Sequence, residues 1–188
     1  RIYTLTLTQT FTSSVGQPDK APAVIPVAMG LVGVDGRQIN LHLEGQLDPV
    51  GHDMVLVLSE PSQTFTFVHV PVEPVPSLLR GFSAPVVLET ELSDDALFVL
   101  LSHDHDPFNR WEAAQKLALR RILNAVHGNG HMELDARFIE AMRGVLRHGE
   151  LDAAFKELVL TLPSEAYVAE QLEVVDPQRI HTAREGIK

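Results

Sequence analysis

The amino-acid composition of the chain changes near residue 90, and this change limits the folds that the chain can adopt. Nine of its 12 prolines lie in residues 1–90, whereas four alanines precede residue 90 and 12 follow it. Proline and β-branched residues are typical of short strands and turns, while alanine and leucine favour helices. We therefore predict a β domain over residues 1–89, followed by a helical domain over residues 90–188.

Several runs in the first domain put apolar side chains on one face with the period of two that is typical of a β-strand. They are residues 2–12, 25–34, 38–43, 54–59 and 63–70. Asp35-Gly36 predicts a hairpin with a type I′ turn, since that turn needs a positive φ at both central positions. About seven short strands with no helix between them predict an immunoglobulin-like β-sandwich.

From Ser93 onward the apolar period becomes that of an amphipathic helix. Ser93 precedes two acidic residues and Asp106 precedes Pro107, and both patterns are typical of helix N-termini. The helix that starts at Pro107 is expected to end at Gly128, with one face made of Phe108, Trp111, Gln115, Ala118, Ile122 and Ala125. Further helices are expected over residues 135–147, 151–160, 164–172 and 177–186, joined by short loops. This arrangement predicts an α-helical bundle or a fragment of a helical solenoid.

The composition argues against several classes of partner. With 15 Lys+Arg and 25 Asp+Glu the net charge is −10, whereas nucleic acids and anionic membranes attract basic surfaces. No apolar run approaches the ~18 residues of a membrane span. The chain has no cysteine, which removes disulfides and thiolate metal sites and fits a cytoplasmic location.

The most conspicuous candidate for metal binding is the run His-Asp-His-Asp at residues 103–106, because imidazole and carboxylate both ligate zinc. Neighbouring side chains of an extended loop point in opposite directions, and Asp106 is already explained as a helix cap. We therefore assign no metal ligand to this run. His127 and His131 have the i, i+4 spacing of a helical zinc pair, but the two glycines between them break a helix, so we interpret them as loop residues.

No motif of nucleophilic or phosphate chemistry is complete. Ser83 lacks the second glycine of a nucleophile elbow. The chain contains no phosphate-binding loop, no G-x-G-x-x-G and no H-E-x-x-H. The residues alone therefore predict no catalytic residue and no cofactor or metal site in this chain.

Both ends of the chain have the pattern of interrupted elements. Residues 1–8 already alternate as a strand, and residues 180–188 still have a helical pattern. We expect a piece of a longer polypeptide, with the chemistry in the part that is not here.

Two stretches resemble bacterial-type aminopeptidase N, the alanyl aminopeptidases, which are zinc metallopeptidases of the gluzincin kind. The first is PSLLRGFSAPV at residues 76–86, and the second is HDHDPFNRWEAAQ at residues 103–115. Similarity also runs through residues 25–31, 162–165 and 176–177. The resemblance therefore extends over nearly the whole chain.

The resemblance implies a place inside a four-domain enzyme that releases N-terminal residues from peptides. Residues 1–89 resemble its small β-sandwich, and residues 90–188 resemble the start of its C-terminal helical domain. The family's zinc ligands belong to a catalytic domain outside this segment, so zinc and peptide substrates are expected of the parent enzyme only. The expected partners are the catalytic and N-terminal domains of the same polypeptide. An incomplete helical repeat leaves an apolar face uncovered, which predicts self-association.

The resemblance also points to a structural junction built from the two matching stretches. Its expected members are Arg80, Gly81, Phe82, Pro85, Asp106, Arg110, Trp111 and Gln115. In this hypothesis Gly81 relaxes the backbone, Pro85 fixes it and Phe82 anchors it in a core. Arg110, Trp111 and Gln115 then lock the first long helix against this joint.

Two other hypotheses remain open from the sequence. One is a free-standing β-sandwich binding or interaction module with a helical appendage, which the mid-strand start of the chain argues against. The other is a small metallohydrolase built on residues 103–106, which a metal titration would separate from a scaffold.

Overall fold

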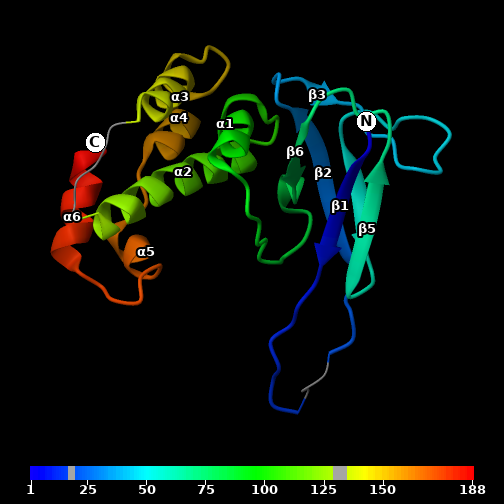
Figure 1. Ribbon diagram of the computed structural model, residues 1–188, viewed down its shortest axis with the longest axis horizontal. Helices are drawn as coiled ribbons and strands as arrows, with labels where there is room; N and C mark the ends of the chain where they lie inside the picture. The colour runs from blue at the N-terminus through cyan, green and yellow to red at the C-terminus, as the bar shows by residue number, and fades with distance from the viewer. Residues whose placement is uncertain (17–19, 129–134) are drawn as a thin grey trace. The chain divides into compact units, whose positions relative to one another are not determined.

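A computed structural model describes residues 1–16, 20–128 and 135–188. These residues form two compact units, Arg1–Glu91 and Leu92–Lys188. The first unit consists of strands and the second of helices, so the predicted order of a β domain followed by a helical domain is confirmed (Figure 1). The division falls two residues after the boundary expected from composition.

The described part of the first unit holds six strands in two antiparallel sheets. One sheet pairs β1 (Tyr3–Thr8) with β5 (Ser62–Phe67). In the other sheet β2 (Ile25–Gly33) is central, and β6 (Pro74–Leu78) pairs along one of its edges. The opposite edge pairs first with β4 (Met54–Leu58) and then with β3 (Gln38–Ile39).

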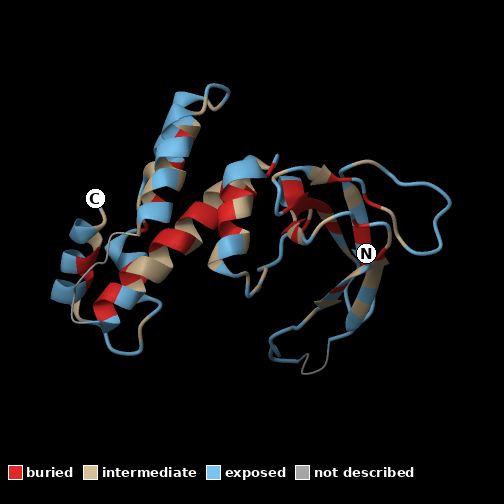
Figure 2. Ribbon diagram, turned by 45° about the horizontal axis from the view of Figure 1, so that its top comes forward, coloured by how far each residue is buried: buried red, intermediate tan, exposed pale blue. Residues whose placement is uncertain are grey.

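The two sheets pack against each other around an apolar core (Figure 2). Leu5 and Phe67 from the first sheet and Met29, Leu31 and Leu56 from the second are all buried in it. Alternation along β1 sends Leu5 to the core and the flanking threonines to the other face, whereas β2 and β4 have apolar side chains on both faces. The predicted β-sandwich is therefore present, with a core made by the alternating residues.

The hairpin at Asp35-Gly36 is present, but its turn differs from the prediction. Gly36 has a φ of 82°, whereas Asp35 has no positive φ. The strand pair closes where the Gly33 N–H donates to the Arg37 carbonyl at 2.8 Å, which leaves three residues in the loop. This is the three-residue hairpin in which a left-handed glycine follows a type I turn, so the type I′ prediction is wrong.

Strand β6 is not among the runs named from the sequence, and its two prolines, Pro74 and Pro76, are unfavourable in the middle of a sheet. Among the described residues β6 pairs with β2 alone, and Pro76 lies opposite Leu31. It is thus an edge strand, where a residue without an N–H is tolerated. Val75, Ser77 and Leu78 are its buried side chains.

The described part of the second unit contains six α-helices. They are α1 (Asp94–His103), α2 (Pro107–His127), α3 (Ala136–Arg147), α4 (Ala153–Leu160), α5 (Glu165–Ala169) and α6 (Pro177–Gly186). Each begins after a Ser or Asp whose side chain accepts a backbone N–H of the first turn. The predicted caps are confirmed, since Ser93 accepts the Ala96 N–H and Asp106 accepts the Asn109 N–H.

Helix α2 is the centre of the second unit and contacts α1, α4, α5 and α6 (Figure 1). Near its end, Ile122 and Val126 share a core cluster with Val168 of α5 and Ile180 of α6. The predicted apolar face of α2 is correct in its second half, where Ala118, Ile122 and Ala125 are buried, whereas Phe108, Trp111 and Gln115 are only half-buried. None of the helices in the described ranges is both long and apolar enough to span a membrane.

Candidate functional site: the Arg80 turn and the helical brace

The candidate junction begins at Arg80, whose guanidinium is buried directly after β6. Arg80 is only 8% exposed, and it opens the short 3₁₀ helix η1 (Arg80–Phe82). Its nitrogens donate to Ser77 Oγ at 2.8 Å, Asp53 Oδ1 at 2.7 Å, Gln38 Oε1 at 3.2 Å and the His52 carbonyl at 3.4 Å. A buried cation is tolerated when its donors are satisfied in this way.

Gly30 leaves the space on β2 that this guanidinium occupies. A Cβ placed on Gly30 would lie 2.1 Å from Nη1 and 2.2 Å from Cζ of Arg80. A glycine in the interior of a strand often marks such a close approach. The Arg80 guanidinium therefore occupies the space that a side chain at position 30 would fill.

The backbone around Arg80 is left-handed at three positions. Leu79, Gly81 and Phe82 have φ values of 54°, 60° and 55°, and the Phe82 N–H donates to the Leu79 carbonyl at 3.1 Å. Gly81 adopts this conformation without strain, whereas the two non-glycine residues do not. Phe82 is 69% exposed, so the prediction that it anchors the turn in a core is wrong. The buried position of the turn belongs to Arg80.

Two hydrogen bonds continue the ordered backbone beyond this turn. The Val86 N–H donates to the Ala84 carbonyl at 3.0 Å, which places Pro85 at the centre of a three-residue turn. The Ala28 N–H donates to Ser83 Oγ at 2.9 Å and connects the turn to β2. Ser83 thus has a structural bond, and Pro85 occupies a turn that its fixed φ suits.

Arg110 and Asp104 join the end of α1 to the start of α2. Arg110 donates to the carbonyls of Leu101 at 3.0 Å and Ser102 at 3.3 Å, at the C-terminus of α1. Buried Asp104 accepts the Asp106 N–H at 3.0 Å. Burial lowers the pKa of the Arg110 guanidinium, and the nearby Asp104 carboxylate opposes this shift.

Trp111 and Gln115 contact residues of the helical unit. The rings of Trp111 and Phe108 lie 5.3 Å apart, and Gln115 Nε2 donates to the Thr161 carbonyl at 2.8 Å. Gln115 therefore ties α2 to the end of α4. The expected contact of Arg110, Trp111 and Gln115 with residues 80–85 stays a prediction.

The histidine candidates do not assemble into a metal centre of three ligands. In residues 1–16, 20–128 and 135–188 no group of three or more His, Asp and Glu side chains could hold a metal ion. His103 is the last residue of α1, and His127 is exposed at the end of α2. His131 lies outside the described residues.

A cluster of charged and aromatic side chains braces α1, α2 and α3. Asp94 of α1 accepts from Arg120 at 2.7 Å and from Arg121 at 3.1 Å. Further ion pairs join Arg121 to Asp135, the N-cap of α3, and Arg137 to Asp95. The Arg121 and Arg137 guanidinium groups lie 5.4 Å and 4.4 Å from the centre of the Phe98 ring. The hydrogen bond from Arg121 holds the pKa of Asp135 below its usual value.

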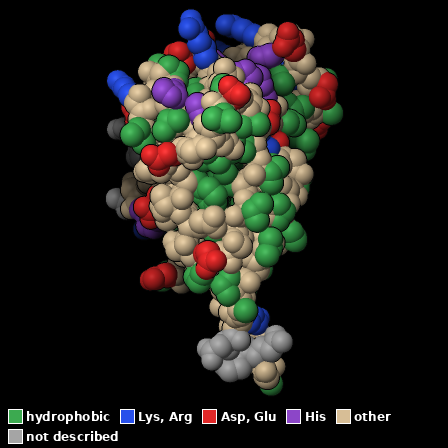
Figure 3. Space-filling model, turned by 90° about the vertical axis from the view of Figure 1, so that its right-hand side faces the viewer, with side chains coloured by type: hydrophobic (Ala, Val, Ile, Leu, Met, Phe, Trp, Pro, Cys, Tyr) green, Lys and Arg blue, Asp and Glu red, His purple; other side chains and the backbone are tan. Residues whose placement is uncertain are grey.

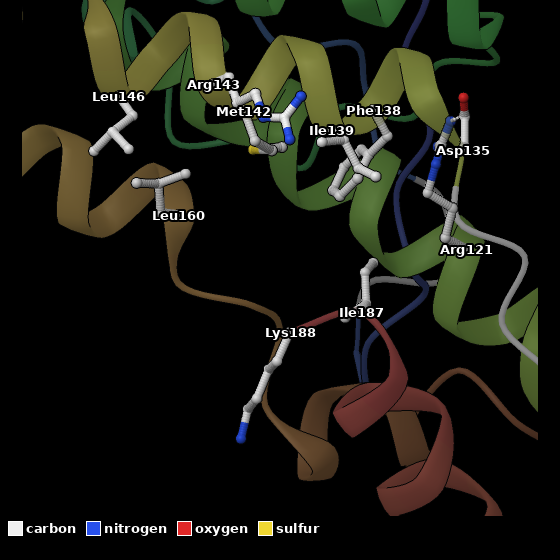
Figure 4. Close-up of a pocket in the computed structure, with 10 residues that line it drawn as sticks. All are labelled: Arg121, Asp135, Phe138, Ile139, Met142, Arg143, Leu146, Leu160, Ile187 and Lys188. Atoms are coloured by element: carbon white, nitrogen blue, oxygen red, sulfur yellow. Dashed lines mark hydrogen bonds and ion pairs between the residues drawn. The ribbon is translucent and has the colours of Figure 1, made fainter.

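Beside this brace an apolar groove opens between α3, α4 and the end of α6 (Figure 4). Its cavity of about 240 Å³ is lined by Phe138, Met142, Leu146, Leu160 and Ile187 among others, and an adjoining cavity of about 420 Å³ shares most of these side chains. Figure 4 shows Ile187 facing the α3 side chains across the groove. The described helices of this unit therefore leave this apolar surface uncovered.

Both units match known protein families. Residues 1–91 match the domain of unknown function DUF3458 with an Ig-like fold, and residues 94–188 match its C-terminal companion, described as ARM repeats. Aminopeptidase N of Escherichia coli K12 is 39% identical over an alignment of 188 positions, which covers 98% of this chain and 21% of that protein. Aminopeptidase N of Caulobacter vibrioides is 38% identical over 161 residues, which are 86% of this chain and 17% of that protein. The chain belongs to the aminopeptidase N family.

A solved structure supports the same assignment. The crystal structure of Legionella pneumophila aminopeptidase A in complex with aspartic acid matches with a TM-score of 0.76 and 27% sequence identity, over 98% of this chain and 19% of that one. The chain spans about a fifth of the length of the aminopeptidases that it matches. Within the family it corresponds to a non-catalytic segment that contains the Ig-like domain and helical repeats.

Replacing Gly30 by alanine should displace the Arg80 guanidinium. The lost hydrogen bonds to a charged group should lower the free energy of unfolding by about 1.5–3 kcal/mol, measured by urea denaturation. In an Arg80→Ala background the same Gly30→Ala change should lower the free energy of unfolding much less, because no guanidinium is left for the new methyl group to displace. Gly144→Ala is the matched control: apart from its chain neighbours and the backbone of its own helix, no atom would lie within 4 Å of a Cβ added at this position of α3, and alanine there should stabilise the helix by up to about 1 kcal/mol. If Gly30→Ala lowered the free energy of unfolding equally in the wild-type and Arg80→Ala backgrounds, Gly30 would not be the residue that makes room for the Arg80 guanidinium.

The helical unit should lose stability in acid through Asp135. Its pKa is lower in the folded state than the ~3.9 of an unfolded aspartate, so the pairing with Arg121 is fully present above that value and is lost as pH falls through the folded pKa. Asp135→Asn keeps a capping residue, and it should flatten the decline of the melting temperature, followed by circular dichroism, between about pH 5 and pH 3. Asp152→Asn, which makes the same change at the cap of α4, is the matched control variant. If the melting temperature of Asp135→Asn declined with pH as steeply as that of the wild type, the Arg121–Asp135 pair would contribute nothing to the acid sensitivity.

Proposed function

We propose that this chain is the linking and capping segment of a cytoplasmic zinc aminopeptidase that releases N-terminal amino acids from peptides. In this role the sandwich spaces the catalytic domain from the helical domain, and the helical domain limits access to small peptides. The similarity to aminopeptidase N over 98% of the chain, but only 21% of that protein, supports the proposal best. The partners are then the catalytic and N-terminal domains of the same polypeptide.

The catalytic zinc of such an enzyme does not fit the residues of this chain. A catalytic zinc site takes three protein ligands and keeps one open position. The sequence has no H-E-x-x-H, and the described residues offer no group of three metal-ligating side chains. We therefore assign zinc and its ligands to another part of the polypeptide and no catalytic residue to this one.

The eight junction residues have a mechanical role in this proposal. Arg80 fixes the turn at the end of the sandwich, while Gly81 and Pro85 set the path of the backbone that follows it. Asp106 caps α2 and Arg110 holds α2 to the end of α1. Trp111 and Gln115 are proposed to hold this helix pair against the turn, with the exposed Phe82 ring as a contact for a neighbouring domain.

The purified 188-residue chain should release no product from an alanyl-arylamide substrate, with or without added Zn²⁺. In the intact aminopeptidase, Arg80→Lys in this numbering should change the preference between short and long peptides, because lysine cannot replace the branched donors of arginine. The kcat for the small arylamide should stay unchanged, because the substitution lies outside the catalytic domain. If the 188-residue chain did hydrolyse the substrate, and His103→Asn or His105→Asn abolished this activity, the result would instead support a small metallohydrolase.

We further propose that two copies of the isolated chain associate through the apolar groove of α3, α4 and α6. Helical repeats bury their apolar faces on neighbouring repeats, and a second copy supplies such a face when the rest of the polypeptide is absent. Leu146 and Leu158 are both 58% exposed, but only Leu146 lines the groove. Sedimentation should show dimers of wild type and Leu158→Glu and monomers of Leu146→Glu. A monomeric wild-type chain at high concentration contradicts this proposal.

A further inference from the structure

The sandwich carries a pair of histidines to which the proposed function gives no role. His42 precedes Leu43 and His69 follows Phe67 by two residues, so both histidines lie just beyond the same end of the antiparallel bridge that pairs Leu43 with Phe67. Figure 3, which faces the sandwich, shows histidine side chains gathered toward one end of its surface. We propose that His42 and His69 form a two-histidine binding site for a divalent transition metal such as Zn²⁺.

The spacing of the two rings is that of ligands on one ion. Their centres are 5.2 Å apart, and their planes are inclined by 39°. A Zn–N bond of about 2.0–2.1 Å, with a ring radius of about 1.1 Å, puts each ring centre ~3.2 Å from the metal. At a tetrahedral angle of about 109° the two ring centres are then ~5.2 Å apart. No large rearrangement of the two rings is needed to reach this separation.

The hydrogen bond of His42 selects the form of the ring that binds metal. His42 Nε2 lies 3.0 Å from the Gln46 carbonyl oxygen. Because a carbonyl oxygen only accepts, Nε2 carries the hydrogen, and Nδ1 of the neutral ring keeps its lone pair. Metal-ligating histidines commonly donate their other N–H to a carbonyl in this way, which fixes both tautomer and ring orientation.

A tight turn holds that carbonyl in place. The Gln46 N–H donates to the Leu43 carbonyl at 3.1 Å, and the Gln46 side chain accepts the Leu43 N–H at 3.3 Å. Gly45, with a φ of 87°, occupies the position of this turn that needs a left-handed residue. The partner of His42 is therefore built into the backbone.

His69 is held in an uncommon backbone conformation beside it. Its φ is 57°, a value that histidine adopts more readily than most residues but at some cost. Hydrogen bonds on both sides maintain it, from the Val68 N–H to the His42 carbonyl at 2.8 Å and from the Val70 N–H to the Arg1 carbonyl at 3.1 Å. Phe67 and Val70 are buried and anchor the same segment.

The chemistry of the site favours a soft or borderline metal. Within the described ranges the site has no third His, Asp or Glu ligand, so water completes the coordination. Imidazole nitrogen suits Zn²⁺, Ni²⁺ and Cu²⁺, whereas Mg²⁺ prefers oxygen ligands. The site should therefore bind Zn²⁺ but not Mg²⁺.

The test is a titration of the 188-residue chain with ZnCl₂, followed through the imidazole C–H resonances in ¹H–¹³C NMR spectra. The resonances of His42 and His69 should shift together and saturate at the same zinc concentration, and MgCl₂ should leave them unmoved. His42→Gln and His69→Asn should each weaken binding at the remaining histidine by about tenfold or more. Asparagine is chosen at position 69 because it also tolerates a left-handed backbone.

The control is His105→Asn, which removes an exposed histidine of the 103–106 run and should leave the titration of His42 and His69 unchanged. The proposal is overturned if zinc shifts neither resonance or only those of other histidines. It is also overturned if the remaining histidine in His42→Gln or His69→Asn titrates with wild-type affinity. These readings do not depend on peptidase activity, so they are independent of the proposed function.

Discussion

The guanidinium of Arg80 is the interaction on which the arrangement of the β-sandwich depends most. Its acceptors lie on both sides of the central strand, since Gln38 belongs to β3, Asp53 precedes β4 and Ser77 lies in β6. Gly30 lets the guanidinium pass close to the backbone of β2 between them. Most of the acceptors are neutral oxygen atoms, and the Asp53 carboxylate remains largely in water, so burial of the cation does not require burial of an anion. One side chain thus holds both edges of the sheet to its centre.

Signals confined to a few neighbouring residues were sufficient to predict much of the fold. Ser93 and Asp106 cap helices as expected, because capping is decided within one turn of the chain. Alternation identified β5, whose Phe65 and Phe67 lie on one face, whereas β2 is an apolar strand that is buried on both faces from Met29 to Gly33. The same local rules failed for β6, since whether a strand lies at the edge of a sheet depends on which other strands pair with it.

The candidate site was harder to predict because its contacts join distant parts of the sequence. The sequence motif contains both Arg80 and Phe82, and its largest apolar side chain is the expected anchor, but the charged side chain is buried instead. Nothing local connects Arg80 to Asp53 or Gln38. The glycine at position 30, inside an apolar strand, was the one available sign that another group lies against that strand. His42 and His69 likewise come together only through pairing of their segments.

The left-handed turn at Leu79, Gly81 and Phe82 has a consequence for the order of folding. Non-glycine residues in this conformation cost about 1–3 kcal/mol each, so an isolated segment 79–82 would not hold it. The turn can form only once Gln38, Asp53 and Ser77 are in place to receive Arg80, which requires β2, β3, β4 and β6 to be assembled. The direction in which the chain leaves the sandwich is therefore set last. A polypeptide emerging from the ribosome would fix its path toward the helical repeats only after the sandwich that precedes them is complete.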